Sequence, residues 1–136
     1  MSFTLLPAAS AAPIEIDLLL DAAFGTGRHA KTTYRLRAGV DCIEALSFVV
    51  RDDRGALAGS IQLWPILLVD AGGEAHPLTL VGPVAVAPAH QGEGVGTLMM
   101  QAALSRADAY GRDAQLLVGD PEYYARFGFA AQPAAD

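Results

Sequence analysis

The stretch VAVAPAHQGEGVGTLMM, residues 84–100, carries three glycines on alternate positions between a run of small apolar residues and an amphipathic pattern. Gly92, Gly94 and Gly96 each weaken local structure, because glycine in a helix costs about 0.5–1 kcal/mol relative to alanine. A strand, a glycine loop and a helix in this order can form an anion site, where unpaired backbone N–H groups meet the positive end of the helix dipole. The stretch therefore predicts a cradle for a diphosphate group, with an ordinary glycine-rich turn as the alternative.

Two common nucleotide-binding motifs built on such a loop do not fit the sequence. A nucleoside-triphosphate P-loop needs Gly-Lys-Ser or Gly-Lys-Thr at the helix start, but the only lysine is Lys31. A Rossmann site needs G-x-G-x-x-G in a parallel β-α-β unit. Here Thr97 stands after the third glycine, the preceding strands are expected to be antiparallel, and only 40 residues follow Gly96. The diphosphate ligand must belong to another class of protein.

Periodicity and turn signals divide the rest of the chain into strands and helices. Apolar residues recur from Val95 to Tyr110 at the spacing of an amphipathic helix. The turn signals DDRG (52–55) and AGGEAHP (71–77) predict a meander of about three strands, and Pro83 predicts an interrupted pairing or bulge in the last of them. The other expected elements are a strand at 3–6, a helix from Pro13 to Gly25 or Gly27, a polar helix at 28–36, a strand in QLLVG (115–119), and a helical turn that Asp120 caps and Gly128 ends.

Composition and charge limit the function classes. Residues 1–136 are expected to form a single domain, with 52% hydrophobic and 18% charged residues. A homodimer interface or a ligand groove could absorb this apolar excess. Nine basic against fifteen acidic residues argue against a nucleic-acid partner. The chain has neither a long apolar segment nor a basic signal sequence, so no membrane association and a cytoplasmic location are expected. One cysteine and three scattered histidines predict no disulfide and no metal site.

Two motifs in a fixed order carry a resemblance to a known family. Gln91, Gly94 and Gly96 spell Q-x-x-G-x-G, and Tyr124, Gly128 and Phe129 spell Y-x-x-x-G-F. The first resembles the acyl-CoA signature of the GNAT superfamily of N-acyltransferases, and the second resembles that superfamily's second motif. LVGDPEYYARFGF, residues 117–129, is similar to the YhbS-like branch.

The resemblance implies an α+β fold with α/β/α layers and a mixed, mostly antiparallel sheet that splays at the acyl-CoA site. It implies acetyl-CoA as the acyl donor and no metal. The implied activity is N-acetyl transfer to a primary amine of a small molecule or protein, by direct transfer in a ternary complex. A non-catalytic acyl-CoA-binding or sensing module is the alternative. The residues implied for acetyl-CoA binding are Val84 and Val86 beside pantetheine, and Gln91, Gly92, Gly94, Val95 and Gly96 at the pyrophosphate.

The catalytic acid implied by the second motif is Tyr124, whose hydroxyl would protonate the departing thiolate. Tyr123 is expected to point elsewhere, because adjacent helical residues lie about 100° apart. The backbone N–H of Val86 is the candidate that polarises the thioester carbonyl. His90 is expected on a surface loop and Cys42 as a small buried hydrophobe, while Trp64 either lines an acceptor pocket or packs in the core. The general base is undecided among Glu15, Glu44, Asp70, His76 and Glu122.

Three departures from the family pattern stand out. Glu93 occupies a position that is often basic, so its carboxylate is expected to point to solvent rather than to the phosphates. The basic partner of the 3′-phosphate is undecided among Arg106, Arg112 and Arg126. Only seven residues follow Phe129, and AAQPAAD has no strand character. The final strand of the family is therefore expected to be missing, because the chain is naturally short, part of the fold has been removed, or a partner subunit supplies it.

Overall fold

Five strands form one mixed sheet in the computed structural model. The structure describes residues 2–25, 27, 37, 39–112, 114–117 and 121–130, and for residues 121 and 122 it describes the backbone alone. The strands are β1 (Thr4–Pro7), β2 (Phe48–Arg51), β3 (Leu57–Val69), β4 (Ala75–Val86) and β5 (Gln115–Leu117). They lie side by side in chain order; the first three pairs are antiparallel, and β4 and β5 are parallel. The predicted α+β class and mostly antiparallel sheet are confirmed.

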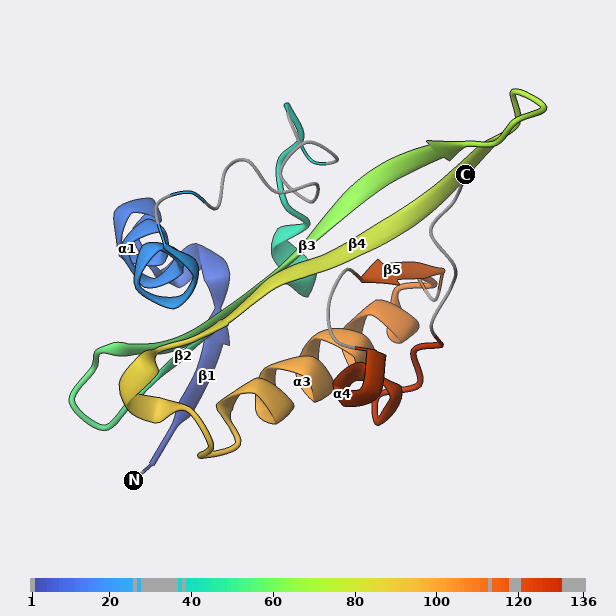
Figure 1. Cartoon of the computed structure of the whole chain (residues 1–136). Helices are drawn as coiled ribbons and strands as arrows, with labels where there is room; N and C mark the ends of the chain where they lie inside the picture. Colours follow the sequence, from blue (N-terminus) through green and yellow to red (C-terminus); the bar gives the residue numbers. More distant parts are fainter. Residues whose placement is uncertain are drawn as a thin grey trace.

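Helices cover both faces of this sheet. They are α1 (Pro13–Phe24), α3 (Val95–Ala109) and α4 (Pro121–Ala125), with short 3₁₀ turns η1 (Ala8–Ser10), η3 (Glu44–Leu46) and η4 (Pro88–His90). Figure 1 shows α1 on one face and α3 with α4 on the other, which gives the predicted layers. The polar helix expected at 28–36 and the cap expected at Asp120 lie outside the described residues. Within the described part of the chain, no helix has the length and hydropathy needed to cross a membrane.

The strand β2 is buried on both of its faces. Val49 packs in the apolar cluster under α1, with Leu19 and Leu20, whereas its neighbour Val50 packs in the cluster under α3, with Met99. Successive side chains of a strand point to opposite faces, so a strand between two helical layers has apolar residues at every position. The high apolar content of the chain is therefore partly explained by a sheet with two cores.

The pairing of β3 with β4 is interrupted near the middle of both strands. Ile61 pairs with Val84, whereas Leu63 pairs with Val81, so β4 contains one extra residue between these two pairs. The extra residue falls at Gly82–Pro83, which confirms the bulge predicted from Pro83. β5 pairs with β4 only over 79–81, before this bulge. Among the described residues, the last part of β4 therefore has no strand neighbour on the β5 side, and its edge is open.

The helix α3 lies very close to β3 at Gly59. A Cβ atom added there would lie 2.7 Å from Cγ1 of Val95 and 2.8 Å from Cε of Met99. Glycine therefore allows the first turn of α3 to lie directly on the sheet. Val95 is the first residue of α3 and directly follows Gly94, so this contact also sets the distance between the glycine loop and the sheet.

We expect Gly59→Ala to destabilise the protein by about 1–3 kcal/mol, the usual cost of overpacking a core. The methyl group must displace Val95 and Met99, both fully buried. Urea unfolding measures the loss. Gly72→Ala is the matched control, because its added Cβ would be 3.4 Å from the nearest atom, an ordinary contact. Equal stability of the two variants would contradict the close approach of α3.

Candidate active site

A pocket of about 510 Å³ opens where the free edge of β4, the glycine loop and α4 meet. Every residue predicted from the two motifs to bind acetyl-CoA or to act as the acid lines this pocket, including Tyr124. The lining residues are Ala23, Phe24, Val84, Val86, His90, Gln91, Gly92, Gly94, Val95, Gly96, Thr97, Tyr123, Tyr124 and Arg126. Residues from the N-terminal helix, the middle of the chain and its C-terminal part are thus brought to one cavity.

The three glycines of the loop serve two different purposes. Gly92 and Gly94 have φ angles of 81° and 84°, in the left-handed region that disfavours other residues. Gly94 is the N-cap residue of α3. Gly96 has no positive φ angle, and a Cβ there would lie 3.2 Å from the hydroxyl of Tyr123, which would have to shift by a few tenths of an ångström. All three glycines line the pocket.

The backbone of the first turn of α3 faces the pocket. Val95, Gly96 and Thr97 all line it, and the first N–H groups of a helix have no intrahelical acceptor. These groups carry the positive end of the helix dipole, about half an elementary charge. The geometry is suited to an anion held mainly by backbone N–H groups.

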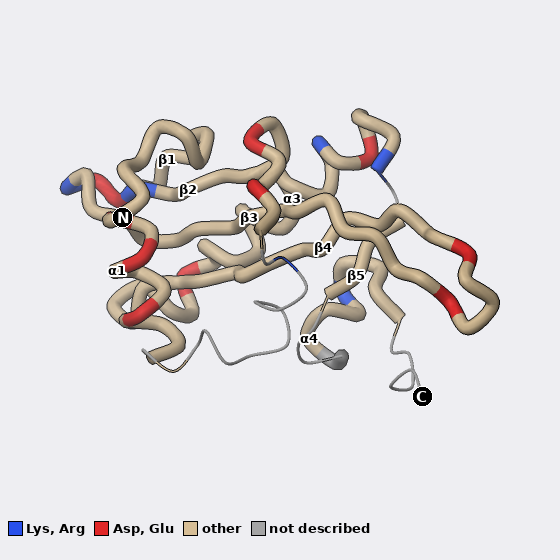
Figure 2. The backbone as a smooth tube through the Cα atoms, turned by 90° about the horizontal axis from the view of Figure 1, so that it is seen from above, with Lys and Arg blue, Asp and Glu red and all other residues tan. Residues whose placement is uncertain are grey.

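The charge of the pocket differs from that of the whole chain. Among the described residues that line it, none is acidic, and only His90 and Arg126 can carry a charge near neutral pH. The chain as a whole has a net charge of −6. Figure 2 shows the acidic residues distributed over several separate segments of the backbone. The pocket is thus suited to an anion despite the acidic composition of the chain.

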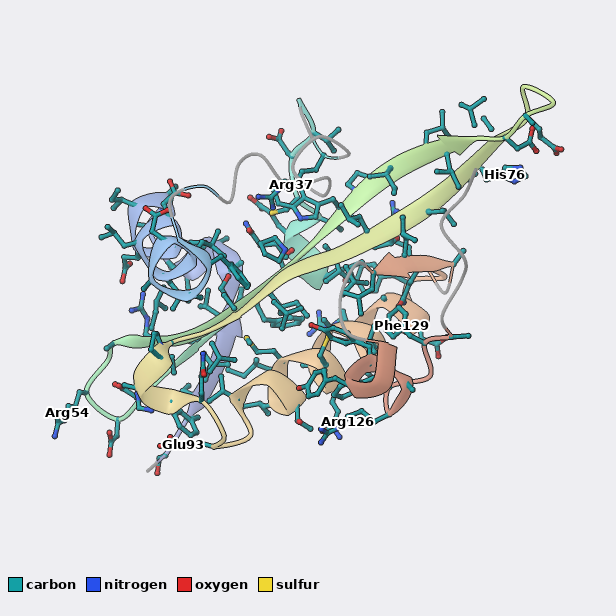
Figure 3. All side chains as sticks on the ribbon, viewed as in Figure 1. Arg37, Arg54, His76, Glu93, Arg126 and Phe129 are labelled. Carbon is teal, nitrogen blue, oxygen red and sulfur yellow. The ribbon has the colours of Figure 1, made fainter. Side chains whose placement is uncertain are left out.

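Arg126 is the arginine that lies at the pocket (Figure 3). Its guanidinium carbon is 5.0 Å from the ring centroid of Tyr123 and 5.5 Å from that of Phe127. Arg106 lies elsewhere, over the ring of Phe48 at 5.7 Å. Among the described residues, Arg126 is therefore the only one of the three arginines considered for the 3′-phosphate that lines the cavity.

An aromatic cluster forms the α4 wall. The rings of Tyr123 and Tyr124 meet edge to face at 4.9 Å, and Tyr124 also contacts Phe129 at 6.4 Å. These edge-to-face contacts fix the orientation of both tyrosines. The sequence prediction that Tyr123 points elsewhere is wrong, because both tyrosines line the pocket.

His90 is buried rather than exposed on a loop, and this prediction is also wrong. It is 8% exposed, and its two ring nitrogens lie 3.0 Å from carboxylate oxygens of Asp52 and Glu93. The hydrogen bond to Glu93, followed by that to Asp52, raises the pKa of His90 above its usual value, although burial opposes this shift. Glu93 does not line the pocket, which agrees with the prediction that its carboxylate points away from the phosphates. The carboxylate is not free in solvent, however, because it bonds to His90.

None of the candidate bases whose side chains the structure describes lines this pocket. Glu15 accepts two hydrogen bonds from Arg51, at 3.0 and 3.2 Å, and this pairing lowers its pKa. Asp70 and His76 pair with each other at 2.9 Å on the turn of the β3–β4 hairpin, far from α1 (Figures 2 and 3). Asp70 and His76, together with Glu74, also place three potential metal-ligand atoms within 4.8 Å, which the histidine spacing did not reveal. The side chain of Glu122 is outside the described residues.

A second pocket, of about 400 Å³, lies along α1. Trp64 lines it, and its indole N–H donates to the carbonyl oxygen of Gly82 at 2.6 Å, at the β4 bulge. The guanidinium of Arg37 stacks 4.4 Å from the Trp64 ring centroid. Glu44 lines the same pocket, as does Cys42, which is half-buried rather than fully buried as predicted. Trp64 therefore lines a pocket, and that this pocket takes the acceptor stays a prediction.

Comparison with known proteins identifies the family to which this fold belongs. Residues 15–131 match the family model described as "Acetyltransferase (GNAT) domain". This chain therefore belongs to the GNAT acetyltransferase family. It is 32% identical over 114 residues to "Uncharacterized N-acetyltransferase YhbS" of Escherichia coli K12, which covers 84% of this chain and 65% of that protein. The chain thus spans about two thirds of the length of the curated relatives that it matches.

Solved structures give the same assignment. A GNAT family acetyltransferase from Brucella melitensis, in complex with acetyl-CoA, is 31% identical with a TM-score of 0.71; the match covers 96% of this chain and 84% of that one. Escherichia coli YhbS, in complex with CoA, is 28% identical, also with a TM-score of 0.71; the match covers 93% and 68%.

We expect the loop glycines to respond differently to alanine. Gly94→Ala forces a side chain into the left-handed region and should cost about 1–2 kcal/mol of stability. Gly96→Ala lies in a regular helix, where alanine is favoured by about 0.5–1 kcal/mol, and the displaced atom is the end of a tyrosine side chain. Thermal unfolding should therefore show a lower Tm for the first variant only. Equal losses would mean that both glycines are required for the same reason.

Proposed function

We propose that residues 1–136 form one GNAT-type acetyltransferase domain that transfers an acetyl group from acetyl-CoA to a primary amine of a small molecule or protein. The observation that carries this proposal is the convergence of the seven predicted binding residues and Tyr124 on one cavity beside an open strand edge. The complexes of the two related structures with acetyl-CoA and CoA support it.

The chain's own groups suggest how acetyl-CoA would be held. The pyrophosphate would be bound by the loop from Gln91 to Gly96, through backbone N–H groups at the start of α3. Arg126 would add the positive charge for a further phosphate. Pantetheine would lie along the open edge of β4 beside Val84 and Val86, whose backbone groups beyond the bulge are available for pairing.

The reaction would join the acceptor amine to the acetyl carbon and break the carbon–sulfur bond. When bound, acetyl-CoA supplies an activated thioester. The N–H of Val86 would polarise the carbonyl, as an oxyanion donor does. Tyr124 would give its hydroxyl proton to the departing sulfur, while the amine loses a proton to water. The Tyr124 hydroxyl would then regain a proton from water, which completes the turnover.

The second pocket is the site that we propose for the acceptor. Direct transfer requires both substrates at once, and α1 contributes residues to both cavities. The pocket combines an aromatic wall, Trp64, with the charged side chains of Arg37 and Glu44, which suits a polar amine.

Trp64→Phe keeps the aromatic ring but removes the N–H that reaches Gly82. We expect this variant to raise the KM of the acceptor severalfold and the KM of acetyl-CoA less, because Trp64 lines the second pocket and not the first, although its N–H reaches the β4 bulge. Steady-state kinetics with each substrate varied in turn measures the split. A rise in the acetyl-CoA KM alone would contradict this assignment of the second pocket.

A non-catalytic acyl-CoA-binding or sensing module is the alternative. Glu93 is one reason to consider it, but its carboxylate bonds to His90 and does not line the pocket. The presence of Tyr124 in the cavity favours the enzyme. The homodimer, the cytoplasmic location and the lack of a nucleic-acid partner stay predictions.

Calorimetric titration with acetyl-CoA, followed by a thiol-release assay over a panel of amines, tests the proposal. Binding with turnover of at least one amine is the expected result. An absence of binding at submillimolar acetyl-CoA would remove both the enzyme and the sensing module. Binding without turnover on a broad panel would favour the sensing module.

Tyr124→Phe should lower kcat by about 10²- to 10⁴-fold and leave the Kd of acetyl-CoA nearly unchanged, because only the acidic proton is lost. Tyr110→Phe is the matched control, since Tyr110 is 56% exposed at the end of α3 and outside the pocket. An unchanged kcat in the Tyr124 variant would reduce this tyrosine to a packing role.

A further inference from the structure

A buried histidine lies between two carboxylates immediately before the glycine loop. Nε2 of His90 is 3.0 Å from Oδ2 of Asp52, and Nδ1 is 3.0 Å from Oε2 of Glu93. The side chain of Asp52 is 7% exposed and that of Glu93 is 43% exposed. The ring of Phe3 meets the imidazole edge to face at 5.4 Å. His90 also lines the pocket proposed for acetyl-CoA, so this cluster connects the pocket with the turn that carries Asp52.

The two contacts fit one protonation state of the ring. A neutral imidazole has one N–H and one lone pair, whereas the imidazolium donates from both nitrogens. Both neighbours here are carboxylates, so a neutral ring would direct a lone pair at one of them. Burial raises the pKa of the Asp52 carboxyl, but the hydrogen bonds from His90 and from two backbone N–H groups together outweigh burial. The net effect is a lowered pKa, so Asp52 stays ionised. The cluster is therefore built for a positively charged His90.

Asp52 makes this cluster a link between two loops. Its Oδ1 accepts hydrogen bonds from the backbone N–H groups of Arg54 and Ala56, at 2.9 and 3.0 Å, and so holds the β2–β3 turn. Its Oδ2 bonds to His90, which directly precedes Gln91 in the glycine loop. The loop is thus anchored to a rigid hairpin through one imidazolium.

We propose that His90 is a positioning residue for acetyl-CoA binding, which it serves by holding the Glu93 carboxylate away from the pyrophosphate and by fixing the glycine loop to the β2–β3 turn. The inference rests on the proposed function. Glu93 stands between Gly92 and Gly94, so its carboxylate would repel a diphosphate if it turned inward. In Figure 3 it lies on the loop before α3, at the end of the sheet near the β2–β3 turn.

The direction of the pH dependence follows from the cluster. Among the described residues, Asp52 and Glu93 are the charged groups that contact the ring. Because these contacts raise the pKa of His90, the link is complete below the ordinary histidine pKa of about 6.5 and is lost as the pH rises through the raised value. Loss of the proton leaves two carboxylates beside a neutral ring, so acetyl-CoA affinity falls as the pH rises.

The experiment compares His90→Gln, Glu93→Gln and the double variant with His76→Gln as the control. His76 also bonds to a carboxylate, that of Asp70, but on an exposed turn outside the pocket. Calorimetry gives the Kd of acetyl-CoA between about pH 7 and about pH 9.5, above the second phosphate pKa of about 6. Steady-state kinetics separates KM from kcat.

We expect His90→Gln to raise the Kd and KM of acetyl-CoA by about tenfold, the size of one lost charge-assisted contact, with a smaller change in kcat. The pH dependence of wild-type binding should disappear in this variant. The double variant should recover affinity, because a neutral amide in place of the Glu93 carboxylate no longer repels the phosphates. Glu93→Gln alone should bind acetyl-CoA well and with a flatter pH profile than wild type, and His76→Gln should behave as wild type.

Three results would overturn the assignment. One is wild-type affinity and pH profile in His90→Gln. Another is a lower kcat with an unchanged KM, which would assign His90 to the chemistry. The third is a double variant no better than His90→Gln. If His90→Gln fails to fold, a wild-type pH profile of acetyl-CoA binding in Glu93→Gln would by itself overturn the assignment of His90. Failure of wild type to bind acetyl-CoA would instead reject the proposed function, so the two failures are distinct.

Discussion

The single extra residue in β4 at Gly82–Pro83 is the constraint on which the pocket depends. It shifts the register with β3, and β5 pairs with β4 only before it. Among the described residues, the backbone polar groups of the following segment, which ends at Val86, therefore have no strand neighbour on one side. Unpaired backbone groups at a strand edge are costly unless water or a ligand satisfies them. Val84 and Val86, which follow the bulge, line the first cavity, and Trp64, which lines the second, donates its indole N–H to Gly82 at the bulge.

The sequence predicts most of this framework because its signals are local. Proline has no backbone N–H to donate to a ladder, so Pro83 predicts an interrupted pairing without knowledge of the partner strand, although Pro65 and Pro77 stand in β3 and β4 at positions of regular register. The amphipathic period from Val95 marks α3, and the glycines before it mark the loop. The α1 helix ends at Gly25, one of the two residues proposed. The two motifs then place Tyr124 and Gln91 in the same cavity, as the structure has them.

The errors concern side chains whose neighbours come from distant parts of the chain. His90 reads as a loop residue because its neighbours in sequence are Ala89 and Gln91, whereas its buried partner Asp52 is 38 positions away. Nothing local distinguishes Asp52 from a turn residue of the DDRG signal, and it fills both roles. Tyr123 is misplaced for a related reason. An angular offset on a helix of five residues does not say which wall of a pocket the helix forms.

An acidic chain that holds an anion must keep its carboxylates away from the site, and the cluster around His90 is one means of doing so. Glu93 lies next to the loop glycines, and its charge is compensated by an imidazolium rather than by solvent. Charge compensation inside a partly buried cluster is less screened by salt than compensation at the surface. The positive contribution to the pocket therefore comes from backbone N–H groups, one arginine and a histidine whose proton two carboxylates retain. Affinity for the anion is consequently linked to the proton on His90, rather than to a fixed basic residue in the loop.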